Sequence, residues 1–155
     1  MVNSAEKLAR EVVAAFGDDD IDRIGTLVTD DFVDHGAPPW APPGRDGYLS
    51  IMRFLKDVLQ IRYELHEVVA DGDLVAARAT VHGVHNSGSL GFAPTGRPYA
   101  MNTMHMYRAE GGRLAEHWGV RDELSVLWQV VPSRRPNRWH CSTGGTSLTP
   151  GGAAA

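Results

Sequence analysis

Two carboxylates and an indole lie on one face of the last strand that the sequence predicts. Side chains at alternate positions of a strand share a face, and here that face carries Leu114, Glu116, Trp118, Val120 and Asp122. Because it is largely apolar, we expect this face to point inward. A carboxylate among apolar groups loses hydration, so its pKa rises and it can act as a general acid or base near neutral pH. A structural interpretation stays open, in which Asp122 ends the strand and caps the next element while Glu116 pairs with an arginine.

Two histidines are further candidates for chemistry. His105 lies in the strand predicted over residues 99–108, where alternation does not settle which face is inward, so it either lines a pocket or is a structural residue. His35 comes just before a proline-rich segment over residues 37–44, where it either contacts a ligand or is an ordinary polar loop residue.

The seven histidines do not form a metal-binding pattern. His82 and His85 are three residues apart in a predicted strand, so their side chains point to opposite faces and cannot share an ion. The sequence has no helical His-x-Glu-x-x-His motif and no cluster of cysteine and histidine. Glycine-rich phosphate-binding and nucleophile-elbow motifs are also absent. We therefore expect neither a metal nor a cofactor.

The spacing of apolar residues changes from helical to alternating partway along the chain. Helical spacing predicts three helices, over residues 3–17, after the run of aspartates at residues 18–20, and over residues 46–59. Alternation predicts strands from Ile61 to Ala70, from Leu74 to His85, from Tyr99 to Arg108 and from Arg113 to Asp122, with a bulge near Val68 and a tight turn at Asp71-Gly72. Residues 124–131 either extend the sheet or form a short helix.

Three helices followed by at least four antiparallel strands predict an α+β fold. One curved, mainly antiparallel sheet wrapped against the helices would enclose a hydrophobic pocket on its concave face. Beyond Val131 the chain turns to serine, arginine, proline, glycine and alanine, a composition that cannot bury a core. We therefore expect one domain over residues 1–131 and a flexible C-terminal tail over residues 132–155, which holds the single cysteine, Cys141.

Composition excludes several classes of protein. The chain has 155 residues, 43% of them hydrophobic, and a net charge of −4. These values fit one globular domain and argue against nucleic acid as a partner. The start of the chain has no signal-peptide pattern, and no apolar run approaches the roughly 20 residues that a bilayer requires. We expect a soluble cytoplasmic protein that does not bind membranes.

Several segments together are typical of one protein family. They are Phe32-Val33-Asp34-His35, Asp71-Gly72-Asp73-Leu74-Val75 with Arg78, Pro94-Thr95-Gly96-Arg97, His105-Met106-Tyr107-Arg108, Glu110-Gly111-Gly112-Arg113, Glu116-His117-Trp118-Gly119-Val120-Arg121-Asp122 and Leu127-Trp128-Gln129. In their order and spacing, over roughly residues 5–131, the chain resembles the SnoaL-like polyketide cyclases, which belong to the wider NTF2-like group of α+β barrels.

The resemblance implies a cone-shaped barrel around a deep hydrophobic pocket, in a homo-oligomer that is a dimer or tetramer. It also implies a cofactor-free intramolecular aldol closure of an aromatic polyketide, with one aspartate as general acid/base and neither a metal nor a covalent intermediate. That aspartate follows the tryptophan of the last strand, which assigns the role to Asp122 and makes His105 the second catalytic candidate. The expected substrate contacts are His35, Trp118, Glu116, Tyr48, Trp40 and Arg78.

The same group of proteins leaves alternatives open. Some of its members are cofactor-free hydroxylases of similar substrates, and others open epoxides, dehydrate or isomerise. Small NTF2-like domains also occur as non-catalytic ligand-binding proteins. Ionisable residues in an apolar pocket favour an enzyme over a binding module.

Overall fold

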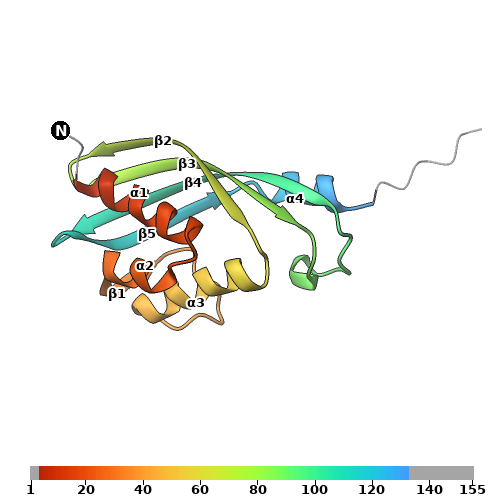
Figure 1. Cartoon of the computed structure of the whole chain (residues 1–155), viewed down its shortest axis with the longest axis horizontal. Helices are drawn as coiled ribbons and strands as arrows, with labels where there is room; N and C mark the ends of the chain where they lie inside the picture. Colours follow the sequence, from red (N-terminus) through yellow and green to blue (C-terminus); the bar gives the residue numbers. More distant parts are fainter. Residues whose placement is uncertain (1–3, 133–155) are drawn as a thin grey trace, which may run out of the picture.

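The computed structural model describes residues 4–132, which form four α-helices, five strands and one 3-10 helix. In chain order these are α1 (Ser4–Gly17), α2 (Ile21–Leu27), β1 (Val28–Asp34), α3 (Gly44–Asp57), β2 (Arg62–Asp71), β3 (Leu74–Val84), η1 (Gly88–Leu90), β4 (Pro98–Glu110), β5 (Arg113–Arg121) and α4 (Glu123–Val130) (Figure 1). The predicted helices and the four predicted strands are all present. The segment after the last strand is a helix rather than an extension of the sheet.

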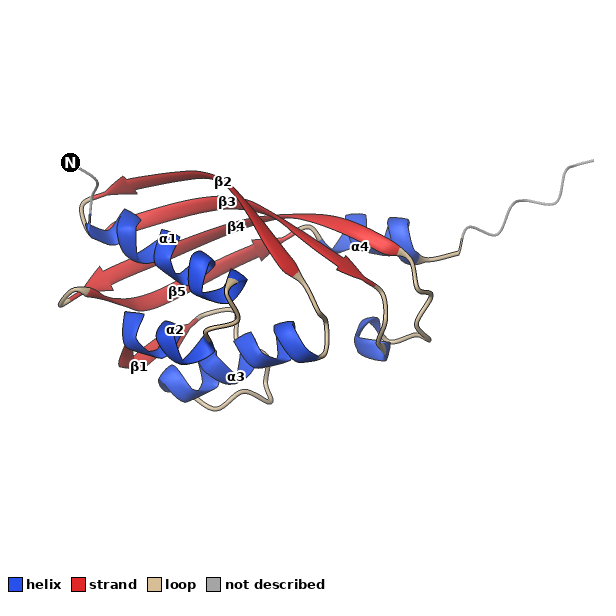
Figure 2. Cartoon of the chain, viewed as in Figure 1, coloured by secondary structure: helices blue, strands red, loops and turns tan. Residues whose placement is uncertain are grey.

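The five strands form one curved sheet in the order β1-β5-β4-β3-β2 (Figure 1). β1 runs parallel to β5, and the other neighbouring pairs are antiparallel. Helices α1, α2 and α3 lie against one face of this sheet (Figure 2). Apolar side chains from the helices and from the sheet make the core, which includes Phe16, Ile24, Phe32, Tyr48 and Leu114. The prediction of an α+β fold with a mainly antiparallel sheet is therefore confirmed.

Strand β1 is not predicted from the sequence. Its buried residues Val28 and Phe32 are four positions apart, and together with the preceding Leu27 this spacing is typical of a helix rather than a strand. No turn separates β1 from α2, whose C-cap is Val28. The strand matters for the site because its parallel pairing with β5 places Asp34 opposite His117.

The predicted inward face of β5 is wrong, because a bulge changes the alternation. Strand β5 has one more residue than β4 at the level of Ala115, which is buried directly after the buried Leu114. An extra residue in one strand turns the side chains that follow it to the opposite face. His117 is accordingly buried, whereas Val120 is 71% exposed. The face that carries Glu116 therefore points outward.

Two predictions concern residues outside the described range of 4–132. The predicted tail, with Cys141, lies outside the described residues except for Pro132, and so does Asn3 at the start of the first predicted helix. The tail stays a prediction. No helix within residues 4–132 is long and apolar enough to cross a bilayer.

Candidate active site

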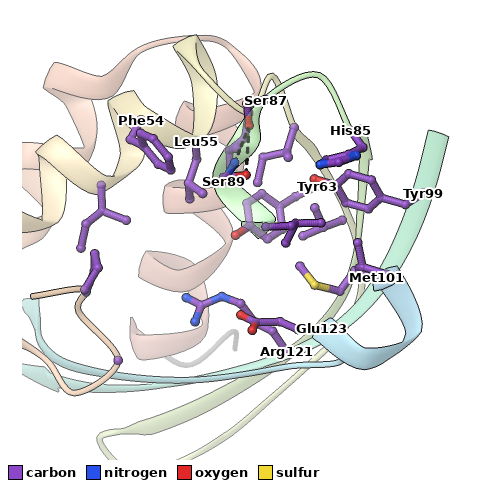
Figure 3. Close-up of a pocket in the computed structure, with 18 of the residues that line it drawn as sticks. Phe54, Leu55, Tyr63, His85, Ser87, Ser89, Tyr99, Met101, Arg121 and Glu123 are labelled. Carbon is purple, nitrogen blue, oxygen red and sulfur yellow. Dashed lines mark hydrogen bonds between the residues drawn. The ribbon is translucent and has the colours of Figure 1, made fainter. Parts of the chain in front are cut away.

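A cavity of about 290 Å³ lies between the sheet, α3 and the loop that joins β3 to β4 (Figure 3). Its wall is largely apolar and includes Ile51, Phe54 and Leu55 from α3 and Tyr63, Val81 and Met101 from the sheet. Small-molecule sites are commonly apolar cavities of about 300–1,000 Å³ with a few polar groups. By size and lining this cavity is a candidate ligand site.

Asp34 and Arg121 add opposite charges to the cavity wall. Asp34 is the last residue of β1, and Arg121 is the last residue of β5. Because the two strands are neighbours in the sheet, their ends bring both side chains to the same region of the wall. In the described part of the chain, no three His, Cys, Asp or Glu side chains are grouped so that they could hold a metal ion.

Behind Asp34, hydrogen bonds run through two buried histidines. His117 Nδ1 lies 2.9 Å from Asp34 Oδ1, and His117 Nε2 lies 2.9 Å from His105 Nδ1. Asp34 Oδ1 also accepts a hydrogen bond from the backbone N–H of Gly36 at 3.0 Å. The side chains of Asp34 and His117 are 7% and 2% exposed, so this chain of hydrogen bonds is shielded from water.

The surroundings of these groups set their charge. Burial raises the pKa of Asp34, but the hydrogen bond and charge of His117, the N–H of Gly36 and the charge of Arg121 together outweigh burial. The net pKa of Asp34 is therefore below its usual value, and its carboxylate is ionised at neutral pH. Burial, together with the charges of His117 and Arg121, lowers the pKa of His105 to about 3. His105 is therefore neutral.

The ionised carboxylate of Asp34 assigns the proton of its hydrogen bond with His117. An ionised carboxylate only accepts hydrogen bonds, so His117 donates from Nδ1 to Asp34. The second hydrogen bond, between His117 Nε2 and His105 Nδ1, holds a single proton shared between the two imidazoles. His105 Nε2 is buried and has no hydrogen-bond partner among the described residues. His105 borders a second cavity of about 30 Å³, large enough for one water molecule, which shares Tyr63 with the main cavity.

His85 lines the main cavity although the sequence does not single it out. Its Nδ1 accepts a hydrogen bond from the backbone N–H of Thr95 at 3.2 Å, so the neutral ring carries its proton on Nε2. His85 is 2% exposed, and its Nε2 has no partner within residues 4–132. The contact depends on how the loop between β3 and β4 folds back, and no spacing rule predicts that.

Asp122 lies at the N-terminus of α4. Its Oδ1 accepts a hydrogen bond from the backbone N–H of Ser125 at 3.1 Å. The residue is exposed and is not part of the cavity wall. This is the capping role that the sequence left open. The prediction that Asp122 points inward is wrong, and its catalytic role stays a prediction.

Three predicted substrate contacts form a cluster outside the cavity. His35 Nε2 lies 2.9 Å from Glu116 Oε2, and its ring stacks on Trp118 with 4.6 Å between ring centroids. Glu116 also accepts a hydrogen bond from Arg108 Nε at 3.1 Å, which is the arginine pairing that the sequence left open. None of these residues lines the cavity, because the bulge in β5 turns Glu116 and Trp118 outward.

The other predicted substrate contacts are divided between the cavity and its surroundings. Trp40 lines the main cavity. Tyr48 is buried in the core, with its hydroxyl 3.4 Å from that of Tyr107, and borders the smaller cavity. Arg78 is exposed outside the cavity, where its Nη2 lies 2.9 Å from Glu67 Oε1. Helical and strand spacing indicates burial but does not distinguish a core position from a cavity wall.

Helices and a curved sheet that enclose an apolar cavity with a buried carboxylate define this chain as an α+β protein of the NTF2-like fold. Residues 6–130 match the family model described as SnoaL-like polyketide cyclase. The chain belongs to the SnoaL-like polyketide cyclase family.

Three relatives show how distant the similarity is. The chain is 26% identical over 133 residues to the aklanonic acid methyl ester cyclase AcmA of Streptomyces galilaeus, which covers 75% of this chain and 92% of AcmA. The crystal structure of IdmH, a putative polyketide cyclase from Streptomyces antibioticus, superposes with a TM-score of 0.70 at 29% identity and covers 82% of this chain and 98% of IdmH. The crystal structure of AclR, a putative hydroxylase from Streptomyces galilaeus, superposes with a TM-score of 0.67 at 25% identity and covers 80% of this chain and 92% of AclR.

Proposed function

We propose that this protein is a cofactor-free cyclase that closes a ring in a polyketide by an intramolecular aldol-type reaction. The observation that carries the proposal is the ionised carboxylate of Asp34 in the wall of an apolar cavity. Such a carboxylate can remove a proton from a carbon next to a carbonyl, and the cavity can hold that carbon against a second carbonyl. Membership of the family and the similarity to AcmA, which is named as a cyclase, favour this class of reaction.

In the proposed mechanism Asp34 acts first as the base. It takes the proton from the substrate carbon, and the electron pair of the C–H bond forms an enolate. The enolate carbon bonds to the carbonyl carbon of the same molecule, whose oxygen becomes an alkoxide and receives the proton from Asp34. Atoms balance, so the product has the mass of the substrate. His117 orients the carboxylate through its Nδ1–H, and His105 holds the His117 ring in place through its Nε2.

The lowered pKa of Asp34 restricts the substrates that this mechanism can use. A weak base transfers a proton efficiently only from a carbon acid that is itself unusually acidic. A carbon between two carbonyl groups meets this requirement, and one next to a single ketone does not. We therefore expect an aromatic polyketide with a 1,3-dicarbonyl unit.

Asp122 is the competing candidate for the general acid/base. In that version of the proposal its carboxylate leaves the N–H of Ser125 and turns into the cavity when the substrate binds. The two assignments of the general acid/base predict opposite effects of Asp34→Asn and Asp122→Asn on turnover, so an experiment can distinguish them. His105 is a positioning residue in the Asp34 version, since it acts through His117.

A second candidate function is hydroxylation without a cofactor, which the similarity to AclR favours. The two functions differ in the mass of the product. Ring closure leaves the mass unchanged, whereas hydroxylation adds one oxygen atom.

The test is to incubate the purified protein with a panel of anthraquinone-bearing polyketide methyl esters and to analyse the products by liquid chromatography and mass spectrometry. The proposal expects a product of unchanged mass and altered retention that does not form without protein. A gain of one oxygen atom would favour the hydroxylase. Tight binding without any product would favour a ligand-binding protein instead.

We also propose that the chain forms a homo-oligomer through the outer face of the sheet. Met104, Met106 and Val120 lie exposed on β4 and β5, and pairing brings Met104 opposite Val120. A contiguous patch of exposed apolar side chains commonly marks a surface that binds another protein chain. Light scattering should give more than one chain per particle, and Val120→Glu should reduce that number.

A further inference from the structure

The guanidinium of Arg121 borders the apolar cavity and has no hydrogen-bond or ion-pair partner among residues 4–132. None of its nitrogens lies within 4.0 Å of a carboxylate oxygen in the described part of the chain, and it donates no hydrogen bond there. Its charge is nonetheless felt by the surrounding groups, since it contributes to the pKa of Asp34, Tyr63, His105 and Tyr107. The carboxylates of Asp34 and Glu123 border the same cavity, but neither lies within ion-pair distance of Arg121. The N–H groups of the guanidinium are therefore available to an oxygen of the substrate.

Gly119 provides space for the Arg121 side chain, and Gly36 lies between Arg121 and Asp34. A Cβ atom at Gly119 would lie 3.2 Å from Arg121 Nη2, 3.4 Å from its Cζ and 3.2 Å from His117 Cε1, so the guanidinium and the His117 ring both lie where a side chain is missing. A Cβ atom at Gly36 would lie 3.6 Å from Asp34 Oδ1 and 3.8 Å from Arg121 Nη1. The carboxylate and the guanidinium thus border one small space without touching each other.

In this arrangement one side chain can accept the proton of a substrate while the other binds the negative charge that remains. The Asp34 carboxylate accepts protons, and the guanidinium of Arg121 is a cation that offers several N–H donors in a fixed plane. When a C–H bond beside a carbonyl loses its proton, negative charge appears on the carbonyl oxygen. A fixed cation beside that oxygen stabilises the charge most when the surroundings exclude water, as an apolar cavity does.

We propose that Arg121 binds the enolate oxygen of a 1,3-dicarbonyl substrate, and that the cavity therefore prefers enolised 1,3-dicarbonyl compounds as anions over neutral ketones of the same size. The inference rests on the proposed function, because the enolate is the species that Asp34 would generate. It adds the charge state in which the substrate is bound and a second residue that touches the reacting atoms. Figure 3 shows Arg121 at the floor of the cavity, across the open space from Phe54 and Leu55.

The test uses 1-phenylbutane-1,3-dione, whose enolate absorbs at longer wavelength than its neutral forms. The dione is titrated with base, with and without an excess of wild-type protein, Arg121→Gln, Arg121→Lys or Gly119→Ala, and the enolate band is followed by difference absorbance. Binding of the neutral ketone 1-phenylbutan-1-one by each protein, measured by calorimetry, is the control for an intact cavity.

Wild-type protein should lower the apparent pKa of the bound dione by at least about one unit, which corresponds to roughly tenfold tighter binding of the enolate than of the neutral form. Arg121→Gln should abolish this shift and bind the neutral ketone as wild type does, and Arg121→Lys should retain part of the shift. Gly119→Ala keeps the guanidinium but adds a Cβ atom against both Arg121 and His117, so it should reduce the shift.

Equal shifts in wild type and Arg121→Gln would overturn the inference, and so would the absence of any shift or of dione binding up to the limit of solubility. A parallel loss of neutral-ketone binding in Arg121→Gln would show that Arg121 only maintains the cavity. None of these readouts needs turnover. A shift without ring closure would therefore keep the enolate site and reject the cyclase, and ring closure without a shift would do the reverse.

Discussion

Replacing Asp34 by asparagine should destabilise the protein in a way that depends on pH. The substitution keeps the size of the side chain and an oxygen that can accept from His117 and Gly36, but it removes the charge. A hydrogen bond to a charged group contributes about 1.5–3 kcal/mol and a neutral one about 0.5–1.5 kcal/mol, so two weakened bonds cost about 2–3 kcal/mol. Relief from burying a charge offsets part of this cost. We expect a net loss of about 1–2 kcal/mol at neutral pH.

The sign of the pH dependence follows from the lowered pKa of Asp34. A carboxylate whose pKa is lower in the folded than in the unfolded chain stabilises the fold above its usual pKa, and that contribution is lost as the pH falls. The difference between wild type and Asp34→Asn should thus be complete at pH 7 and should shrink below about pH 3.8, the ordinary value for aspartate. At neutral pH it corresponds to a fall in Tm of roughly 2–8 °C.

Urea unfolding at several pH values measures this difference directly. Asp31→Asn is the matched control, because Asp31 lies on the same strand and is exposed, and it should leave stability nearly unchanged. If Asp34→Asn is as stable as wild type at pH 7, or if the difference grows as the pH falls, the assignment of an ionised, hydrogen-bonded Asp34 is wrong.

Three further outcomes are expected. Burial lowers the pKa of His105 from 6.5 to about 3, so the free energy of unfolding of wild type should fall by up to about 1.4 kcal/mol per pH unit between pH 6.5 and about 5. His105→Asn should lack this part of the fall. Urea unfolding measures it, and the same dependence on pH in both proteins would contradict the prediction. Asp122→Ala should cost about 0.5–2 kcal/mol through the lost helix cap, measured in the same way, and no loss would mean that the cap contributes nothing. Turnover should survive EDTA, and inactivation reversed by added metal would reject the metal-free mechanism.

The fold could be predicted to the level of its elements because the signals for them are local. Apolar spacing, the aspartates before α2 and the turn at Asp71-Gly72 each act within a few residues. Strand β1 is missed because its seven residues bury Val28 and Phe32 at helical spacing. What makes it a strand is its pairing with β5, about 85 residues away in the sequence, and no local pattern reports such a contact.

The candidate site was less predictable because one residue decides which side chains face the cavity. The extra residue at Ala115 exchanges the two faces of β5, so His117 and Arg121 replace Glu116 on the inside. Capping by Asp122 and pairing of Glu116 with an arginine were both left open by the sequence analysis. Both are present in the structure. Asp34 lies within a segment that carried the family resemblance, but only the contact with His117 distinguishes it from its neighbours.

The most direct test of the account compares turnover of wild type, Asp34→Asn and Asp122→Asn on one substrate from the panel that wild type converts to a product of unchanged mass. All three proteins are first shown to be folded by circular dichroism at the assay pH. If Asp34 is the base, Asp34→Asn should lose about 10²–10⁴-fold in rate, the usual range for general acid–base catalysis, while Asp122→Asn stays close to wild type. Loss of turnover in Asp122→Asn with an active Asp34→Asn would contradict the account and assign the chemistry to the residue that caps α4.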